Sequence, residues 1–153
     1  MTPCINTLKK RKINYIIHKY KHDPKSKSYG LEVVEMLGLE KNRVFKTLVV
    51  SANNQLSVAI VPVSSTLNLK LFAKAMGTKK AEMAEVSKVE NSTGYILGGV
   101  SPIGQKKRLK TFIDSSSQEF ETIFVSAGRR GLEVELNPDD LALVVEGVFV
   151  SLS

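Results

Sequence analysis

Two adjacent runs of β-prone residues most restrict the folds open to this chain. Residues 44–52 and 56–63 are rich in valine and other apolar residues, and they flank the pair Asn53-Asn54. Asparagine tolerates the positive φ angles of a tight two-residue turn, so the pattern predicts an antiparallel hairpin. Both faces of the first run are mostly apolar, which predicts a central strand that is covered on both sides.

Shorter patterns on either side of the hairpin predict the remaining elements. Caps, stops or periodicity mark four or five short helices, at Thr2-Pro3, before Gly38, at Asn68, over 86–91 and at Asn137-Pro138. Besides the hairpin, strands are expected at 15–20, 79–84, 108–114, 122–126, 132–136 and 147–152. Because strands and helices do not alternate regularly, we expect an α+β domain with a mixed, curved, barrel-like β-sheet and flanking helices, not a doubly wound parallel sheet.

The length of 153 residues favours one domain with a sizeable core. Cys4 is the only cysteine, which excludes an internal disulfide and a thiolate metal cluster and favours a reducing compartment. No apolar run approaches the roughly 20 residues of a membrane-spanning helix. The first residues lack the basic and then apolar order of a signal peptide. We therefore expect a cytoplasmic protein with no membrane partner.

Positive charge is concentrated in four places along the chain. The formal net charge is +7 and the isoelectric point is about 9.5. Solvated surface faces would explain any one cluster, but four clusters with no comparable acidic block indicate a polyanionic partner such as nucleic acid. The clusters lie at residues 9–12, at Lys19, Lys21, Lys25 and Lys27, at residues 106–110, and at Arg129 and Arg130.

The most unusual segment is residues 94–108, with the sequence GYILGGVSPIGQKKR. Three glycines, a serine and a proline fall within seven positions, between an apolar lead-in and a basic exit. Glycines let a backbone approach a ligand closely and direct its N–H groups at it. The segment matches neither the Walker phosphate loop nor the Rossmann fingerprint. It is either a loop that holds an anionic or carbonyl-bearing ligand or a simple glycine turn.

Lys46 is the single residue that points most directly to chemistry. It lies in the first strand of the hairpin and shares a face with Val44, Leu48 and Val50. Burial of an unpaired ammonium group is costly. A lysine on a covered strand therefore either reaches water from a strand edge or meets a phosphate, ribose or carboxyl group in a cleft.

A search for a protein nucleophile or a metal site yields no candidate. Ser101 lacks the Gly-x-Ser-x-Gly elbow, and Cys4 fits a small buried core residue. His18 and His22 fall in a strand and in the loop after it, with no third His or Cys ligand evident. We expect no metal and no cofactor. An enzyme with this sequence would rely on positioning, backbone N–H donors and groups of the substrate itself.

Three segments taken together resemble a known family. They are VFKTLVV at 44–50, STGYILGGVSPIGQKKR at 92–108 and FVSAGRRGL at 124–132. In this order they resemble the YbaK family of trans-editing aminoacyl-tRNA deacylases, which are freestanding relatives of the editing domain inserted in bacterial prolyl-tRNA synthetase. The likeness covers essentially the whole chain, which implies a single editing domain over residues 1–153. It also implies a single α+β fold with a mixed, barrel-like sheet.

The resemblance implies roles for individual residues. Lys46 would contact the tRNA 3′ end, and Gly98 and Gly99 would cradle the scissile ester and stabilise its oxyanion. Ser101 and Pro102 would shape this substrate-binding loop. The residues implied to line the substrate pocket are Tyr20, Thr47, Ser126 and Glu133, the last at a position where relatives carry aspartate.

The implied reaction removes cysteine that has been mischarged onto proline tRNA. The substrate thiol would attack its own ester carbonyl and release a cyclic thiolactone, so the enzyme would be a hydrolase or, by this route, lyase-like. The implied partners are Cys-tRNA(Pro) and prolyl-tRNA synthetase. Two alternatives remain open: a deacylase for another small amino acid such as alanine, and a non-catalytic module that binds tRNA or a synthetase.

Overall fold

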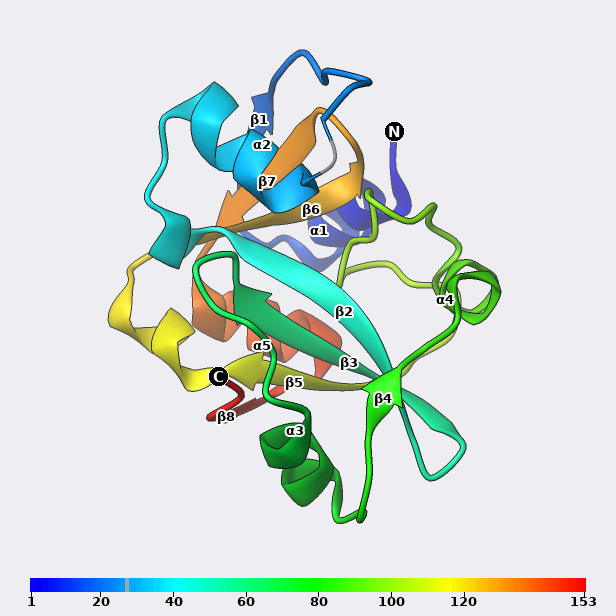
Figure 1. The fold of residues 1–153 in the computed structure, drawn as a ribbon. Helices are drawn as coiled ribbons and strands as arrows, with labels where there is room; N and C mark the ends of the chain where they lie inside the picture. Colours follow the sequence, from blue (N-terminus) through cyan, green and yellow to red (C-terminus); the bar gives the residue numbers. More distant parts are fainter. Residues whose placement is uncertain (27) are drawn as a thin grey trace.

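The computed structural model describes residues 1–26 and 28–153, so Lys27 of the second basic cluster lies outside the described residues. The described chain has an α+β fold with two sheets, of order β4-β2-β3-β5-β8 and β1-β7-β6 (Figure 1). The strands are β1 (Ile16–Lys19), β2 (Phe45–Ala52), β3 (Gln55–Pro62), β4 (Glu82–Met83), β5 (Lys110–Asp114), β6 (Ile123–Arg129), β7 (Leu132–Leu136) and β8 (Val148–Val150). The helices are α1 (Pro3–Arg11), α2 (Tyr29–Leu37), α3 (Leu69–Met76), α4 (Val86–Thr93) and α5 (Pro138–Val145).

The predicted hairpin forms the centre of the larger sheet. Strands β2 and β3 pair antiparallel from Phe45–Pro62 to Ala52–Gln55. Asn53 and Asn54 make the turn with φ angles of 54° and 60°, as the asparagine pair predicts. The sheet is mixed because β3 pairs parallel with β5, and β5 pairs parallel with β8.

The predicted helix caps also form. The Thr2 hydroxyl accepts a hydrogen bond from Ile5 N, and the side chains of Asn68 and Asn137 each accept from two backbone N–H groups of their helices. These bonds satisfy amides that the first turn of a helix leaves without partners. None of the described helices combines the length and apolar character needed to cross a membrane.

Several predicted boundaries are wrong, among them β5, which begins at Lys110, and β8, which is limited to Val148–Val150. The strand predicted at 79–84 is limited to Glu82–Met83, because β4 is an exposed edge strand that pairs with Val50 and Ser51. The strand predicted at 122–126 runs on to Arg129, since a bulge between Ser126 and Arg129 lets β6 keep its pairing with β7. Helix α4 ends at Thr93 and not at residue 91, followed by a left-handed Gly94.

The main hydrophobic core lies between the two sheets. Helix α1 contributes Cys4, Ile5 and Leu8, all fully buried, and α5 contributes Leu141, Val144 and Val145. These side chains pack with apolar residues of β3, β5, β6 and β7. A second core lies under α3, where Phe72 meets Phe112 edge to face at 5.5 Å.

The two sheets meet at a short junction beside β2. Val44, the residue before β2, forms a parallel bridge with Phe124 of β6. Arg43 lies next to this bridge, with its guanidinium 5.1 Å from the centre of the Phe124 ring. The junction therefore fixes the start of β2 against the smaller sheet.

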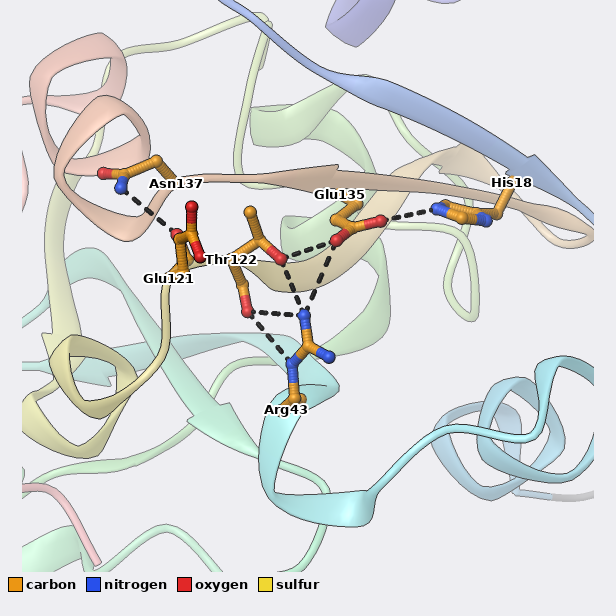
Figure 2. A network of polar contacts seen from close by, with 6 residues as sticks. All are labelled: His18, Arg43, Glu121, Thr122, Glu135 and Asn137. Atoms are coloured by element: carbon orange, nitrogen blue, oxygen red, sulfur yellow. Dashed lines mark hydrogen bonds and ion pairs between the residues drawn. The ribbon is translucent and has the colours of Figure 1, made fainter.

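A polar network holds this junction (Figure 2). The Arg43 guanidinium donates to the carbonyl and hydroxyl oxygens of Thr122 and lies 3.5 Å from the Glu135 carboxylate. Glu135 in turn accepts a hydrogen bond from Thr122 and lies 2.9 Å from His18 Nε2. The network links the turn before β2 to β1, β6 and β7.

We predict that Arg43→Met lowers the free energy of unfolding by about 1–3 kcal/mol, because Thr122 and Glu135 lose their donor in a partly buried site. The matched control is Arg108→Met, whose ion pair with Glu146 is more than half exposed on both sides. That variant should change stability by only about 0.5 kcal/mol. Urea unfolding measures both, and equal effects of the two substitutions would contradict a special role for the junction.

Candidate functional site

A cavity of about 360 Å³ opens beside β2, between the sheet junction and the contact of β2 with β4. We call it the Lys46 cavity. Its wall combines the residue after β1, the first half of α2, the first half of β2, the loop after α4, and strands β6 and β7. Six residues singled out in the sequence meet here: Tyr20, Lys46, Thr47, Gly98, Ser126 and Glu133.

Lys46 is the cation on the β2 side of this cavity. The side chain is half-buried, and burial lowers the pKa of its ammonium group. Within the described part of the chain, Lys46 forms no ion pair with a carboxylate. A partly desolvated cation of this kind is suited to an anionic or strongly polar ligand.

Glu133 is the buried acidic residue in the wall of the Lys46 cavity. It lies on β7, paired with Ser126 of β6 and His18 of β1, and is only 6% exposed. Burial raises the pKa of its carboxyl group to about 8. A carboxyl group with this pKa is largely protonated at neutral pH, so it can donate a hydrogen bond as well as accept one.

Two polar atoms of the cavity residues lack hydrogen-bond partners among the described residues. They are Oγ1 of Thr47 and Oε2 of Glu133, and both are buried. Native proteins leave few buried polar atoms unmatched, because each costs free energy. Both residues line the Lys46 cavity, so their unmatched oxygens mark a polar part of its wall, although neither oxygen atom is exposed to solvent.

The glycine loop packs closely against the Arg129-Arg130 corner after β6. Gly98 has a φ angle of +94°, and a Cβ atom there would lie 2.7 Å from Arg130 Nε and 2.9 Å from the Tyr29 ring. A Cβ atom on Gly99 would lie 2.8 Å from Arg129 Cα. Both positions therefore require glycine. This close approach holds the loop at the rim of the cavity.

The two glycines differ in what their N–H groups can do. Gly99 N–H donates to the Ile96 carbonyl at 2.9 Å, and Gly99 lines a neighbouring cavity. This bond contradicts the expectation that Gly99 is a free oxyanion donor. Gly98 and Val100 face the Lys46 cavity, and their N–H groups have no partner in the described chain. They are the available backbone donors.

Ser101 and Pro102 lie behind the loop and do not line the Lys46 cavity. Ser101 is fully buried, and its hydroxyl accepts a hydrogen bond from Ile103 N. Pro102 lines a different cavity on the far side of the loop. Their position within the loop is compatible with the predicted loop-shaping role, but direct substrate contact does not fit their burial and position.

Cys4 lies under the same loop, close to Ser101, and is fully buried. Burial raises the pKa of its thiol to about 11. Only the thiolate is a strong nucleophile, so a thiol that stays protonated and is covered by the loop is chemically inert. This placement agrees with the expected core role of Cys4.

Arg130 is held in place by a chain of contacts that sequence reasoning missed. Its guanidinium stacks on Tyr29, 3.5 Å from the ring centre, and Nη1 donates to His22 Nε2 at 2.9 Å. His22 Nδ1 then lies 2.6 Å from the buried carboxylate of Glu32, which also accepts from Asp23 N. The basic pair at 129–130 is visible in the sequence, but no local pattern links it to its aromatic partner Tyr29.

The two histidines pair with different glutamate residues. His18 pairs with Glu135 at the sheet junction, and His22 pairs with Glu32 near the cavity rim. In the described portion of the chain, no group of three His, Cys, Asp or Glu side chains is arranged to hold a metal ion.

Comparison with known proteins places the chain in a family. The sequence profile of the aminoacyl-tRNA editing domain matches residues 23–143. EbsC of Enterococcus faecalis, a candidate Cys-tRNA(Pro)/Cys-tRNA(Cys) deacylase, is 44% identical over 122 residues, which cover 79% of this chain and 74% of EbsC. A proline–tRNA ligase of Thermoanaerobacter sp. (strain X514) is 27% identical over 106 residues, or 68% of this chain and 19% of the ligase.

The fold is shared as well. The crystal structure of a candidate trans-editing enzyme for prolyl-tRNA synthetase superposes with a TM-score of 0.85 at 18% sequence identity, covering 100% of this chain and 98% of that one. The predicted fold class is thereby confirmed. With the profile match and the similarity to EbsC, these findings show that the chain belongs to the aminoacyl-tRNA editing domain family.

Proposed function

We propose that this protein is a trans-editing deacylase that removes cysteine from mischarged Cys-tRNA(Pro). The observation that carries the proposal is the polar lining of the Lys46 cavity. The half-buried Lys46 ammonium group has no carboxylate partner among the described residues, and Oγ1 of Thr47 and Oε2 of Glu133 have no hydrogen-bond partner there. Membership of the editing family and the similarity to EbsC support the choice of an aminoacyl ester as ligand.

In the proposed complex the ester lies between β2 and the glycine loop. Lys46 contacts the polar 3′ end of the tRNA, and the N–H groups of Gly98 and Val100 face the ester carbonyl. Thr47 and Glu133 hydrogen-bond the amino and thiol groups of the cysteinyl moiety. Tyr20 and Ser126 complete the wall around this small side chain.

The proposed reaction uses the sulfur of the substrate as the nucleophile. The sulfur forms a bond to its own ester carbonyl carbon, and the negative charge that develops on the carbonyl oxygen is stabilised by the loop N–H groups. The bond from that carbon to the 3′ oxygen of the tRNA then breaks. The oxygen leaves with the proton that the thiol has lost, and the products are a cyclic thiolactone and free tRNA. Buried Cys4 takes no part in these steps.

We further propose that the editing domain comprises all of residues 1–153 and works in the cytoplasm without a cofactor. Helix α1 precedes the segment that matches the family profile, yet its side chains are part of the main core. The proline–tRNA ligase relative contains a similar segment within a longer chain. This relationship supports prolyl-tRNA synthetase as the partner that brings the substrate to the freestanding domain.

We predict that Lys46→Ala reduces deacylation of Cys-tRNA(Pro) by about 100-fold or more, because the ester end loses its cationic contact in a partly desolvated site. Single-turnover assays with labelled cysteine measure the loss. Cys4→Ala is the control, since it removes the chain's only thiol without changing the cavity wall. Loss of activity in folded Cys4→Ala would contradict the use of the substrate thiol.

The second prediction concerns the acyl group. Cysteine and serine are similar in size, but a hydroxyl group is a much weaker nucleophile than a thiol. Cys-tRNA(Pro) should therefore be cleaved at least about tenfold faster than Ser-tRNA(Pro). Equal rates would indicate attack by water. Faster cleavage of Ala-tRNA(Pro) would favour an alanine deacylase, and tRNA binding without any turnover would favour a non-catalytic module.

The third prediction uses the titration of Glu133. The pKa of this carboxyl group is about 8 in the folded protein and about 4.5 in an unfolded chain. Between these values the folded state binds the extra proton, so burial of Glu133 costs more stability as pH rises. Glu133→Gln keeps the neutral form at every pH. Its stability relative to wild type should therefore rise by up to about 1.4 kcal/mol per pH unit from pH 5 to 8 and level off above pH 8.

Urea unfolding at several pH values measures this difference. Glu146→Gln is the control, because Glu146 is exposed and its carboxylate lies at the surface. A stability difference between Glu133→Gln and wild type that does not change with pH would show that the carboxyl group is already ionised in the fold.

A further inference from the structure

A second cavity, of about 610 Å³, adjoins the Lys46 cavity on the other side of the glycine loop. We call it the Ile96 cavity. Its wall is formed by the N-terminus, the turn after α4 and the corner after β6, and in Figure 1 the yellow-green segment after α4 passes next to the N-terminus. Leu97 and Arg129 line both cavities. A chain that leaves the Lys46 cavity over these two residues enters the Ile96 cavity.

The surface of the Ile96 cavity combines exposed apolar groups with guanidinium groups. Ile96 is 78% exposed and Leu97 is 46% exposed, next to each other on the turn after α4. Arg129 and Arg130 line the same cavity from the corner after β6. Arginine side chains contact the phosphates of single-stranded nucleic acid and can stack on its unstacked bases, and exposed apolar side chains such as isoleucine and leucine can pack against the faces of bases.

The parts of this surface are held in position by hydrogen bonds. Arg130 is fixed by its stack on Tyr29 and by the contacts that run through His22 to buried Glu32. Leu97 N donates to Glu90 Oε2 at 2.9 Å, which ties the apolar turn to α4. Groups that are already ordered lose little conformational freedom when a ligand binds.

We propose that the Ile96 cavity binds the nucleotide that precedes the terminal adenosine at the 3′ end of the tRNA. The proposal rests on the proposed function, which places the aminoacylated adenosine end in the Lys46 cavity. The next groups along the RNA are a phosphate and a second nucleoside. Arg129, on the shared wall, is positioned to meet the phosphate, and the base lies against Ile96 with its edge toward Arg130.

Two cysteinyl esters test the proposal, one of adenosine and one of the dinucleotide cytidylyl-adenosine. With Ile96→Ser, kcat/KM for the dinucleotide ester should fall roughly 5- to 10-fold, because the base loses the apolar side chain against which it packs, whereas kcat/KM for the adenosine ester should not change. The matched control is Leu143→Ser, which removes an equally apolar side chain that is 61% exposed on α5. A fall on both esters, or on neither, would overturn the proposal.

A binding experiment separates this subsite from the proposed reaction. Wild type should bind uncharged cytidylyl-adenosine more tightly than adenosine in an NMR titration, and Ile96→Ser should remove the difference. That result with no cleavage of either ester would support the subsite and contradict the deacylase. Equal affinities of wild type for the two ligands would overturn the subsite, whatever the esters show.

Discussion

The contact between Val44 and Phe124 is the interaction on which the remainder of this structure depends, because it bridges the backbones of the two sheets beside the candidate site. Arg43 reinforces it through Thr122 and Glu135. Lys46 follows Val44 by two residues, and Ser126 follows Phe124 by two. Lys46 and Ser126 both line the Lys46 cavity, so this junction sets how closely the two strands that carry them approach each other.

The cavity concentrates features that a stable fold otherwise avoids. The carboxyl group of Glu133 is buried, the ammonium group of Lys46 is partly desolvated, and the hydroxyl group of Thr47 lacks a partner among the described residues. Gly98 adds a backbone conformation that other residues adopt only with strain. Each feature reduces stability, and their convergence on one cavity is typical of a site shaped by its ligand.

Local signals predicted most of the fold, because hairpin turns and helix caps depend on residues close together in sequence. Asn53-Asn54 predicted the central hairpin, and Asn68 predicted the start of α3. The wrong boundaries of β4 and β6 also came from local patterns. Residues 79–81 were predicted as part of a strand but precede the short edge strand β4, and β6 continues through a bulge that depends on its partner β7. Which residues pair across strands is not encoded in a single segment.

The sequence by itself, read with its family resemblance, determined the hairpin and predicted the glycine loop and Lys46 as parts of the candidate site. Only the tertiary structure decided that Gly99 uses its N–H group within the loop and that Ser101 lies behind it. It also decided that Arg130 stacks on Tyr29. The physical reason is distance along the chain: Tyr29 of α2 and Arg130 between β6 and β7 become neighbours only in the folded protein, so no local pattern of residues can encode their contact.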